Sequence, residues 1–352
     1  MQINELLQLA VDSKASDIHL LSGVPATLRV NGRLTPITAK GLLTSEEVEE
    51  LVWAMLTGEQ RETLTVNREI DFSLEHESKA RFRVNAYYQK GTLAASLRLI
   101  PLEIRSIDEL GLPKICHTFT NLRQGFVLFT GPTGCGKSTT IAAILNEINN
   151  NREEHIVTIE DPIEFVFPKG KSLISQREVH FDTHSWDIAL RSILREDPNV
   201  VLIGEMRDYE TISSALTIAE TGHLVFATLH TNSAAQSIDR IVDVFPEHAK
   251  GQVRMQLSLT LEAVVSQRLI PAITGERLVA TEVMIATSAI RNSIREGKTH
   301  MIDNIIQTSK ELGMHTFESS LAALVKEGKV SIETAQEYAL RPEELMRLVR
   351  GR

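Results

Sequence analysis

The sequence predicts an α/β protein of two domains, a small α+β domain followed by a larger domain with a parallel sheet. Three observations support this prediction. The chain has 352 residues, and one ordinary domain needs only about 150. Within the first hundred residues, segments with helical spacing are combined with segments that alternate between apolar and polar positions, as antiparallel strands do. From Arg123 onward, short apolar runs alternate with helical segments, which is typical of a parallel sheet covered by helices.

Two helices are predicted in the first domain. Residues 3–11 carry apolar side chains at helical spacing and predict an opening helix. Residues 45–56 predict a second helix, for which Thr44 or Ser45 is the N-cap. Glu47 lies close to the position that completes a capping box.

The remaining segments of the first domain predict strands. Residues 18–21 and 27–33 are predicted strands, and residues 70–74, 80–89 and 93–100 alternate like an antiparallel meander. Asn31-Gly32 is predicted to be a hairpin turn, because both residues tolerate a positive φ. The first domain therefore covers residues 1–100. A linker of weak periodicity follows over residues 101–122 and contains Pro113, and the second domain covers residues 123–352.

Four short apolar runs predict the strands of the second domain. They are residues 125–130, 156–159, 200–203 and 224–229. Helical segments separate them, so the predicted sheet is parallel and has helices on both faces. From about residue 285 the pattern is helical to the end of the chain.

Composition and charge restrict the class of protein. The net charge of −9 argues against a duplex-DNA binder, which needs a basic surface, and we expect no nucleic-acid partner. Cys116 and Cys135 are too few for a disulfide framework or a four-thiolate zinc site. Neither a basic, apolar leader nor a run of roughly 18 apolar residues is evident. We expect a cytoplasmic protein that meets a membrane only through partners.

Residues 131–139, Gly-Pro-Thr-Gly-Cys-Gly-Lys-Ser-Thr, match the phosphate-loop pattern G-x-x-x-x-G-K-S/T. The pattern lies between an apolar strand and a helical segment, as a phosphate loop requires. Its glycines allow a tight turn with inward amides, and the helix N-terminus adds positive potential. Lys137 is expected to reach the β- and γ-phosphates, and the Ser138 hydroxyl to bind Mg²⁺. The expected ATP-binding residues are Gly131, Thr133, Gly134, Cys135, Gly136, Lys137, Ser138 and Thr139.

Acidic residues follow two of the predicted parallel strands. Ligands of such sheets bind beyond the carboxyl ends of the strands. Glu205 follows the strand at 200–203, with Gly204 where P-loop ATPases usually have an aspartate, so Glu205 is expected to hold Mg²⁺, either directly or through water. Glu164 is the first candidate for activating the attacking water, and Glu160 and Asp161 are supporting candidates.

Two histidines flank the predicted strand at 224–229. His230 follows its carboxyl end and is a candidate for contacting the γ-phosphate, and His223 precedes its amino end. A straight strand would separate them by about 23 Å. A metal shared between the two imidazoles is therefore not expected, although both residues are candidate site residues.

Four motifs in order resemble those of the type II/type IV secretion ATPase superfamily. They are the phosphate loop, Ile159-Glu-Asp-Pro-Ile-Glu-Phe, Gly204-Glu-Met-Arg-Asp and Thr221-Gly-His-Leu-Val-Phe-Ala-Thr-Leu-His-Thr-Asn, which resemble its Walker A motif, Asp box, Walker B motif and His box. Ser16-Asp-Ile-His-Leu resembles the N-terminal signature of the same superfamily. The resemblance extends over almost the whole chain.

Within this superfamily the chain resembles the ATPases that retract type IV pili. It has no long N-terminal extension and no four-cysteine zinc insert, which pilus-extension and secretion ATPases carry. Residues 289–296, Ala-Ile-Arg-Asn-Ser-Ile-Arg-Glu, resemble the C-terminal motif A-I-R-N-L-I-R-E of retraction ATPases, except that Ser293 replaces leucine. Residues 176–179 and 238–246 are similar to that branch as well.

The resemblance implies a PAS-like N-terminal domain followed by a RecA-like P-loop ATPase domain with a helical C-terminal part. It also implies a homohexamer that hydrolyses ATP with Mg²⁺. Glu164 would be the catalytic glutamate, and Glu205, His223 and His230 would complete the site. Arg81, Arg83 and Arg98 are candidates for binding a phosphate, and which of them does so is open.

As a pilus motor, the protein would act at the inner face of the inner membrane, at the pilus base. Its implied partners are a membrane-embedded platform protein and a paralogous ATPase, and the linker at residues 101–122 would be its hinge. Two alternatives remain open: a related secretion or pilus-assembly motor, and an ATP-binding regulatory paralogue of the retraction ATPase. A small-molecule kinase is disfavoured, because no acceptor pocket or lid is evident in the sequence.

Overall fold

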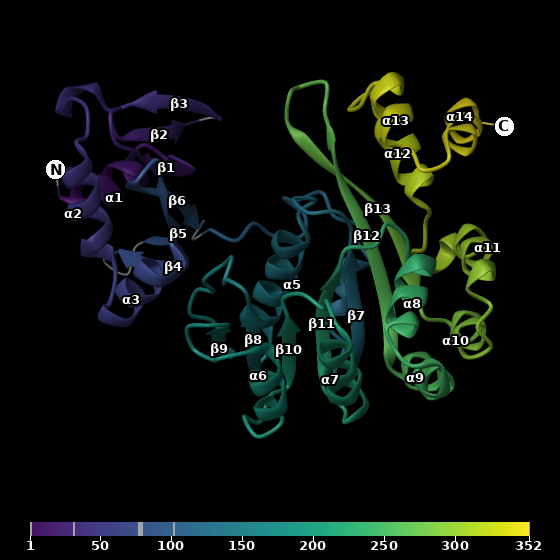
Figure 1. Cartoon of the computed structure of the whole chain (residues 1–352). Coiled ribbons are helices and arrows are strands. Elements are labelled where there is room, and N and C mark those ends of the chain that lie inside the picture. Colours follow the sequence, from purple (N-terminus) through teal and green to yellow (C-terminus); the bar gives the residue numbers. More distant parts are fainter. Residues whose placement is uncertain (1, 31, 77–79, 101–102, 352) are drawn as a thin grey trace. The chain divides into compact units, whose positions relative to one another are not determined.

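The computed structural model describes residues 2–30, 32–76, 80–100 and 103–351. Their contacts divide the chain into two compact units (Figure 1). The first unit comprises Met1–Glu103 and Glu164–Val166, and the second comprises Ile104–Ile163 and Phe167–Arg352. Among the described residues, no helix combines the length and the apolar character that crossing a membrane requires.

The first unit contains an antiparallel sheet with the strand order β3-β2-β1-β6-β5-β4. Its strands are β1 (Asp17–Leu20), β2 (Thr27–Val30), β3 (Arg33–Pro36), β4 (Glu69–His76), β5 (Ala80–Gln89) and β6 (Thr92–Ile100). The predicted meander is confirmed in β4, β5 and β6, which pair antiparallel in chain order. The predicted turn at Asn31-Gly32 falls between β2 and β3, although Asn31 lies outside the described residues.

Both predicted helices of the first unit are present, as α1 (Ile3–Asp12) and α2 (Ser45–Met55). Thr44 is the N-cap of α2 and Glu47 completes a capping box, with the Glu47 carboxylate accepting the Thr44 amide at 2.8 Å. Two elements were not predicted, the short helix η1 (Thr38–Lys40) and α3 (Gly58–Asn67). Leu64 is the only buried residue of α3, so its sequence carries no apolar stripe to reveal it.

The second unit contains a seven-stranded sheet with the order β13-β12-β7-β11-β10-β8-β9. Its strands are β7 (Gly125–Thr130), β8 (His155–Glu160), β9 (Leu173–Glu178), β10 (Val200–Ile203), β11 (Leu224–Leu229), β12 (Leu261–Pro271) and β13 (Arg277–Ile285). All neighbours pair in parallel except β12 and β13, which form an antiparallel hairpin. The four predicted strands are confirmed, whereas β9, β12 and β13 were not predicted.

Helices cover both faces of this sheet, as the parallel pattern predicted. They are α4 (Cys116–Phe119), α5 (Lys137–Asn151), α6 (Trp186–Ile193), α7 (Tyr209–Glu220), α8 (Ala234–Asp243) and α9 (Glu247–Thr260). Alternate residues of β7 enter different cores, since Val127 and Phe129 pack with α5 while Phe126 and Leu128 pack with α6–α9. Successive residues of a strand face opposite sides of the sheet. Because helices bury both sides, each central strand is apolar throughout.

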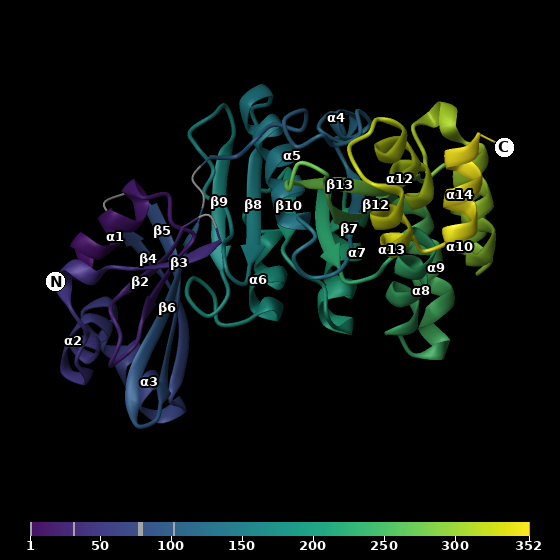
Figure 2. The same cartoon turned by 90° about the horizontal axis from the view of Figure 1, so that it is seen from above.

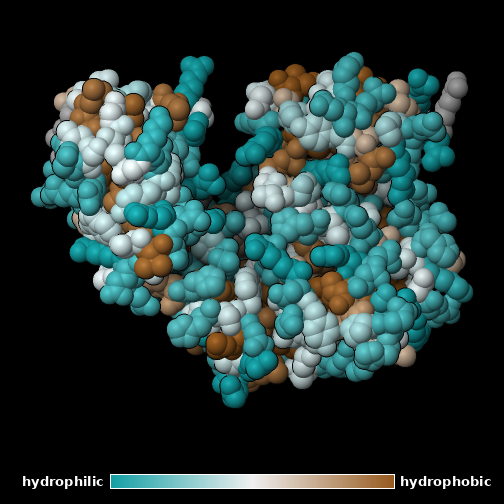
Figure 3. Space-filling view, viewed as in Figure 1, coloured by the Kyte–Doolittle hydropathy of each residue, from teal (hydrophilic) through white to brown (hydrophobic). Residues whose placement is uncertain are grey.

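The C-terminal part is helical, as predicted. It contains α10 (Ser288–Arg295), η2 (Thr299–Met301), α11 (Ile302–Thr308), η3 (Lys310–Leu312), α12 (Phe317–Lys326), α13 (Ile332–Tyr338) and α14 (Pro342–Arg350). Helices α12–α14 pack around Ile270 and Ala280 of the β12–β13 hairpin and form a separate small core. They lie at the yellow end of this unit (Figure 1, Figure 2). The surface seen in Figure 3 is mostly hydrophilic, with scattered apolar residues, as expected of a folded domain.

The predicted linker is largely packed. Residues 101–102 lie outside the described residues, but residues 104–122 belong to the second unit. Ile107, Leu112, Cys116 and Phe119 of this segment are buried in the core that contains α5. Leu112, Cys116 and Phe119 have helical spacing, but Pro113 interrupts the segment, and the helix that forms is the short α4. Residues 104–122 are therefore not a free hinge.

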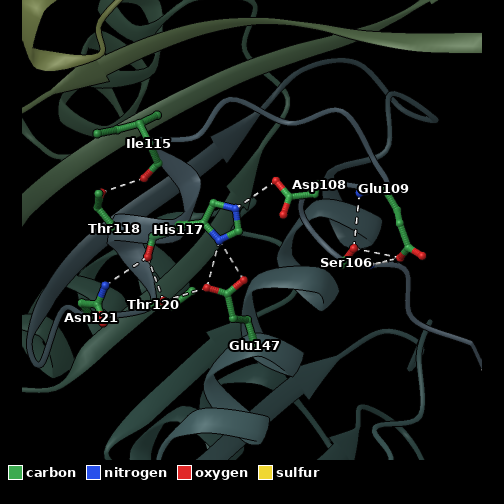
Figure 4. Close-up of polar contacts among 9 residues, drawn as sticks. All are labelled: Ser106, Asp108, Glu109, Ile115, His117, Thr118, Thr120, Asn121 and Glu147. Atoms are coloured by element: carbon green, nitrogen blue, oxygen red, sulfur yellow. Dashed lines mark hydrogen bonds and ion pairs between the residues drawn. The ribbon is translucent and has the colours of Figure 1, made fainter.

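A histidine also attaches this segment to α5 (Figure 4). His117 Nδ1 lies 2.9 Å from Oε2 of Glu147 on α5, and its Nε2 lies 3.3 Å from Oδ1 of Asp108. These two carboxylates, Glu147 first, raise the pKa of His117 above its ordinary value of 6.5. The protonated ring can then donate to both carboxylates at once.

We expect His117→Gln to destabilise the protein in a pH-dependent way. Because the folded-state pKa is raised, the stability that His117 contributes is complete below pH 6.5 and is lost as the pH rises through the raised value. The ring is 36% exposed, so the loss should not exceed about 1 kcal/mol. The melting temperatures of wild type and His117→Gln should differ most near pH 6 and converge at alkaline pH.

Glu147→Gln is the matched control for the carboxylate. If the two groups act together, the double variant should lose no more stability than the more damaging single variant. Additive losses, or a difference between wild type and His117→Gln that does not change with pH, would contradict the assignment.

Candidate nucleotide-binding site

The predicted phosphate loop connects β7 to α5 and turns at three glycines with positive φ. Gly131 has φ +140°, Gly134 +77° and Gly136 +89°. A Cβ atom on Gly131 would lie 2.3 Å from the main-chain oxygen of Gln267, whereas a Cβ on Gly134 would meet nothing within 4 Å. Gly131 is therefore required by packing as well as by backbone geometry.

Strand β12 holds the loop in place. Ser266 Oγ lies 2.7 Å from Thr130 Oγ1 at the end of β7. The next residue, Gln267, is 1% exposed and donates through Nε2 to the main-chain oxygen of Cys135 at 2.8 Å. Gln267 is a loop-positioning residue that the sequence did not reveal. Residues 261–271 mix apolar side chains with Glu262, Ser266, Gln267 and Arg268, so local pattern indicates neither this strand nor the loop that it contacts.

Lys137 is buried at the first position of α5, and its ammonium group faces the loop. Nζ donates to the main-chain oxygens of Gly131 at 2.7 Å and of Pro132 at 3.1 Å. Ser138 and Thr139 follow in the first turn and are half-buried. The helix N-terminus and the Lys137 charge therefore act at the same point, as an anionic phosphate requires.

Cys135 takes part in the phosphate loop through its main chain rather than through its thiol. Its side chain is buried within the loop, and Lys137 Nζ lies 3.9 Å from Sγ. Burial raises the pKa of the Cys135 thiol more than the charge of Lys137 lowers it. A buried, protonated thiol reacts slowly with alkylating agents, so the reactivity that such a cysteine could have is suppressed here.

Gly204 and Glu205 follow β10 at the same edge of the sheet. A Cβ on Gly204 would lie 3.2 Å from the Glu160 Cα atom on β8. This tight contact explains why glycine, rather than the usual aspartate, occupies the position. The Gly204 carbonyl also accepts the Thr228 hydroxyl of β11 at 2.6 Å, which fixes the backbone from which Glu205 extends.

Glu205 lies among three cationic or protonatable groups. Arg207 donates to its Oε2 at 2.7 Å, and His230 Nε2 lies 3.1 Å from its Oε1. The hydrogen bond from Arg207 lowers the pKa of Glu205 more than burial raises it, and Arg207, His230 and Lys137 lower it further by their charges. Glu205 is therefore ionised at neutral pH and suited to binding a cation.

The structure brings His230 to this cluster but not His223. His230 follows β11 at the edge that carries the phosphate loop, and its side chain is 41% exposed. His223 lies at the opposite end of β11, where its main-chain oxygen accepts the amide of Gly125 at the start of β7. Its ring contacts Thr221 Oγ1 at 3.0 Å. The expectation that both histidines share one site is thus not met within the second unit, because a strand separates them.

The acidic segment after β8 is held by β9. The Glu160 side chain is buried and accepts the Thr158 hydroxyl at 2.7 Å, so it is a structural acceptor. Glu178 of β9 accepts the Ile163 amide at 3.2 Å, one residue before Glu164. The motif at residues 176–179 therefore supports this segment, which is a role that the sequence did not reveal.

Asp161 and Glu164 differ in their placement. Asp161 is exposed and lies near Arg207. The pKa of Arg207 is raised mainly by Glu205 and further by the charge of Asp161. Glu164 is also exposed, and Glu164–Val166 groups with the first unit. The catalytic role of Glu164 stays a prediction.

The three candidate arginines of the first unit share one face of its sheet. Arg83 on β5 and Arg98 on β6 are directly opposite each other, and Arg81 is two residues from Arg83 on the same strand, so all three have the same facing. Arg98 donates to Asp17 at 3.0 Å, so its charge is already partly balanced, while Arg83 is exposed.

A cleft of about 510 Å³ opens beside the phosphate loop. One wall is the loop itself, and the other consists of the β12–β13 hairpin and α13. Its lining comprises Pro132, Thr133, Gly134, Cys135, Asn232, Arg268, Leu269, Pro271, Arg277 and Tyr338. No local sequence pattern identifies Arg268, Arg277 or Tyr338, because these residues come together only through the hairpin.

The arrangement fits a nucleotide with a bound divalent cation. The loop amides and Lys137 can bind phosphate, while the Ser138 hydroxyl and the ionised Glu205 carboxylate are oxygen ligands of the kind that Mg²⁺ prefers. Among the residues described, no three His, Cys, Asp or Glu side chains form a metal-binding group. The cation would therefore depend on phosphate oxygens and water for its remaining ligands.

Comparison with known proteins gives one consistent result. A family model described as "Type II/IV secretion system protein" matches residues 1–339. The type IV pilus retraction ATPase PilT of Pseudomonas aeruginosa is 49% identical over 343 residues, which are 97% of this chain and 99% of that protein. A twitching motility protein of Neisseria gonorrhoeae is 48% identical over 319 residues, covering 90% of this chain and 85% of that protein.

A solved structure supports the same conclusion. The crystal structure of the pilus retraction motor PilT with bound ADP matches with a TM-score of 0.93 at 44% identity, covering 99% of both chains. The predicted fold class, a PAS-like α+β domain followed by a RecA-like P-loop ATPase domain with a helical C-terminal part, is confirmed.

We expect Gly131→Ala to abolish nucleotide binding, because its Cβ atom has no room beside the Gln267 backbone. Gly134→Ala is the matched control, since it meets only the strain of a positive φ, about 1–2 kcal/mol. Titration with a fluorescent ADP analogue measures both affinities. Equal affinities would show that the contact with β12 does not determine the shape of the loop.

Proposed function

Because the chain belongs to the type II/IV secretion system protein family, we propose that it is an ATPase motor that powers retraction of type IV pili. The observation that carries the proposal is the cluster of Lys137, Glu205 and His230 beside a phosphate loop. The 49% identity to a pilus retraction ATPase over nearly the whole chain supports the same function.

We propose that ATP binds with its triphosphate on the phosphate loop and its adenosine in the adjoining cleft. The pyrophosphate part accepts hydrogen bonds from the loop amides, and Lys137 exchanges its contacts with the loop carbonyls for the phosphate oxygens. Arg268, Arg277 and Tyr338 offer the cleft planar groups on which a base can stack. The bound ADP of the similar motor structure supports nucleotide binding in this fold.

Ser138 and Glu205 are the residues that would hold Mg²⁺. The low pKa of the Glu205 carboxyl supports this assignment, since the ligand must be ionised at neutral pH. When bound, Mg²⁺ neutralises charge on the β- and γ-phosphates. Arg207 and His230 keep the carboxylate oriented by contacting both of its oxygens.

Glu164 is our candidate for orienting and deprotonating the attacking water, with Asp161 nearby in the same segment. His230 contacts the γ-phosphate from the end of β11, and one of the arginines Arg81, Arg83 and Arg98 stabilises the charge that develops on the phosphate. Arg83 is favoured over Arg98, whose charge is already paired with Asp17. We assign His223 no role at the loop of its own unit.

The motor is proposed to work as a homohexamer. Hydrolysis changes the angle between the N-terminal and C-terminal units, and successive changes around the ring turn a membrane-embedded platform protein. The packing of residues 104–122 onto the second unit supports a hinge near residue 103 rather than along the whole predicted linker. The ring acts on the cytoplasmic side of the inner membrane at the pilus base, and a paralogous ATPase is a further proposed partner.

We expect Lys137→Ala to abolish both ATP binding and turnover, since it removes charge that binds the phosphates. Glu164→Ala should retain nucleotide affinity and lose turnover by roughly a hundredfold or more, the usual contribution of a general base. Phosphate release and nucleotide titration measure the two properties. Loss of affinity in Glu164→Ala would mean that the residue is structural.

Complementation tests the cellular function. A strain that extends pili but cannot retract them should recover retraction, seen by fluorescence microscopy of labelled pili, when it expresses this chain. Lys137→Ala is the control and should not restore it. If retraction does not recover, but pili return in a strain that lacks its extension ATPase, the chain is a related assembly motor. Recovery only together with a second retraction ATPase would indicate a regulatory paralogue.

A further inference from the structure

The loop that carries His230 is held on several sides. It joins β11 to α8 through Thr231, Asn232 and Ser233. Thr231 Oγ1 lies 2.6 Å from Ser237 Oγ inside α8, and the Asn232 side chain accepts Arg268 Nη2 at 3.1 Å. The imidazole of His230 is thus positioned by a loop whose partners come from α8 and β12.

One of these partners is a buried carboxylate that the proposed mechanism does not use. Glu282 on β13 is 3% exposed, and its Oε1 accepts the amide of Ala234 at 2.8 Å. Ala234 is the first residue of α8, so its amide is one of those that the helix itself leaves without an acceptor. The carboxylate also lies at the positive end of the helix dipole.

The surroundings of Glu282 link the loop to the C-terminal helices. The charged groups that act on it are Asp303 of α11, Glu318 of α12 and Arg341 beside α14. Arg341 forms ion pairs with Asp303 and Glu344. Glu318 is similarly buried, but it accepts the amides of Leu340 and Arg341 instead of an amide of α8.

We propose that Glu282 is a positioning residue for ATP hydrolysis, which fixes the start of α8 and thereby holds His230 against Glu205. The inference rests on the proposed function, because it assumes that the His230–Glu205 contact serves hydrolysis. It adds a physical connection from the C-terminal helices through Glu282 and the Ala234 amide to the phosphate site. That connection lies entirely within the second unit.

The hydrogen bond from the Ala234 amide requires an acceptor oxygen at position 282, and it does not require that the side chain be charged. Burial raises the pKa of Glu282 to about 7; the Ala234 amide and Arg341 oppose this, and Asp303 and Glu318 add to it. Near neutral pH the group is thus present in both forms, and each form keeps an oxygen that can accept the Ala234 amide. Glutamine preserves that oxygen, whereas leucine of similar volume does not.

Steady-state kinetics of Glu282→Leu and Glu282→Gln test the proposal. In Glu282→Leu, kcat should fall by roughly tenfold to a hundredfold, as a misplaced catalytic group produces, while KM and ADP affinity stay unchanged. Glu282→Gln should restore most of the activity. When Glu282→Leu is added to His230→Ala, kcat should fall little further than in His230→Ala alone, because both changes remove the same contact.

Glu318→Leu is the matched control, since it removes an equally buried acceptor that does not touch α8. Its melting temperature should fall with kcat preserved. A similar fall of kcat in Glu318→Leu and Glu282→Leu would overturn the inference. It would also be overturned if Glu282→Leu lowered kcat by its full factor in the His230→Ala background. If Glu282→Leu does not fold, Ala234→Pro removes the same hydrogen bond from the donor side, at the helix position that best accepts proline.

Hydrogen exchange separates this inference from the proposed function. Amides of residues 230–234 should exchange faster in Glu282→Leu than in wild type or Glu318→Leu, whether or not the protein hydrolyses ATP. Unchanged exchange would overturn the positioning role. Faster exchange in a protein without ATPase activity would leave the positioning intact and refute the proposed function.

A pH series checks the ionisation of Glu282. The pKa raised from 4.5 to about 7 means that the folded state binds the proton more tightly, so stability is lost as the pH rises between these values. The melting temperature of Glu282→Gln relative to wild type should therefore increase from pH 5 to pH 8. A constant difference would place the carboxyl in a wetter environment than the structure describes.

Discussion

The close approach of β12 to the phosphate loop is the constraint on which the site depends. Parallel pairing with β7 aligns Ser266 with Thr130, and the strand then continues past the end of β7. Its next residue, Gln267, lies against Gly131 and holds the carbonyl of Cys135. The loop is therefore shaped by a strand more than a hundred residues away, and its amides are already oriented before any phosphate arrives.

The same sheet edge collects the polar groups that the chemistry needs. Its central strands end at one level, which brings the phosphate loop, Glu205 and His230 together from three different strands. The glycine before Glu205 allows β8 and β10 to approach closely. Arg207 and His230 contact both carboxylate oxygens and keep Glu205 ionised despite partial burial. A rigid, charged cluster of this kind suits phosphoryl transfer, where positioning and electrostatics provide most of the catalysis.

Two peripheral segments are mechanically attached to this centre. Residues 104–122 pack on α5, where His117 contacts Glu147, so any movement of the segment also acts on the helix that begins at the phosphate loop. The C-terminal helices pack on the β12–β13 hairpin, which contacts both the loop and the start of α8. In a motor, such attachments would transmit events at the phosphates to surfaces that meet partners.

The sequence by itself determined the nucleotide chemistry. The phosphate loop, the strands before it and the positions of Glu205 and His230 follow from local patterns, because each depends on the residue order at one strand end. Distant pairing decided the rest. Strand β12 and its Gln267, the buried carboxylate of Glu282 and the packed linker were not recognisable, since their neighbours are remote in sequence. The separation of His223 from His230, by contrast, follows from the sequence, because the length of β11 alone places the two rings at opposite ends of that strand.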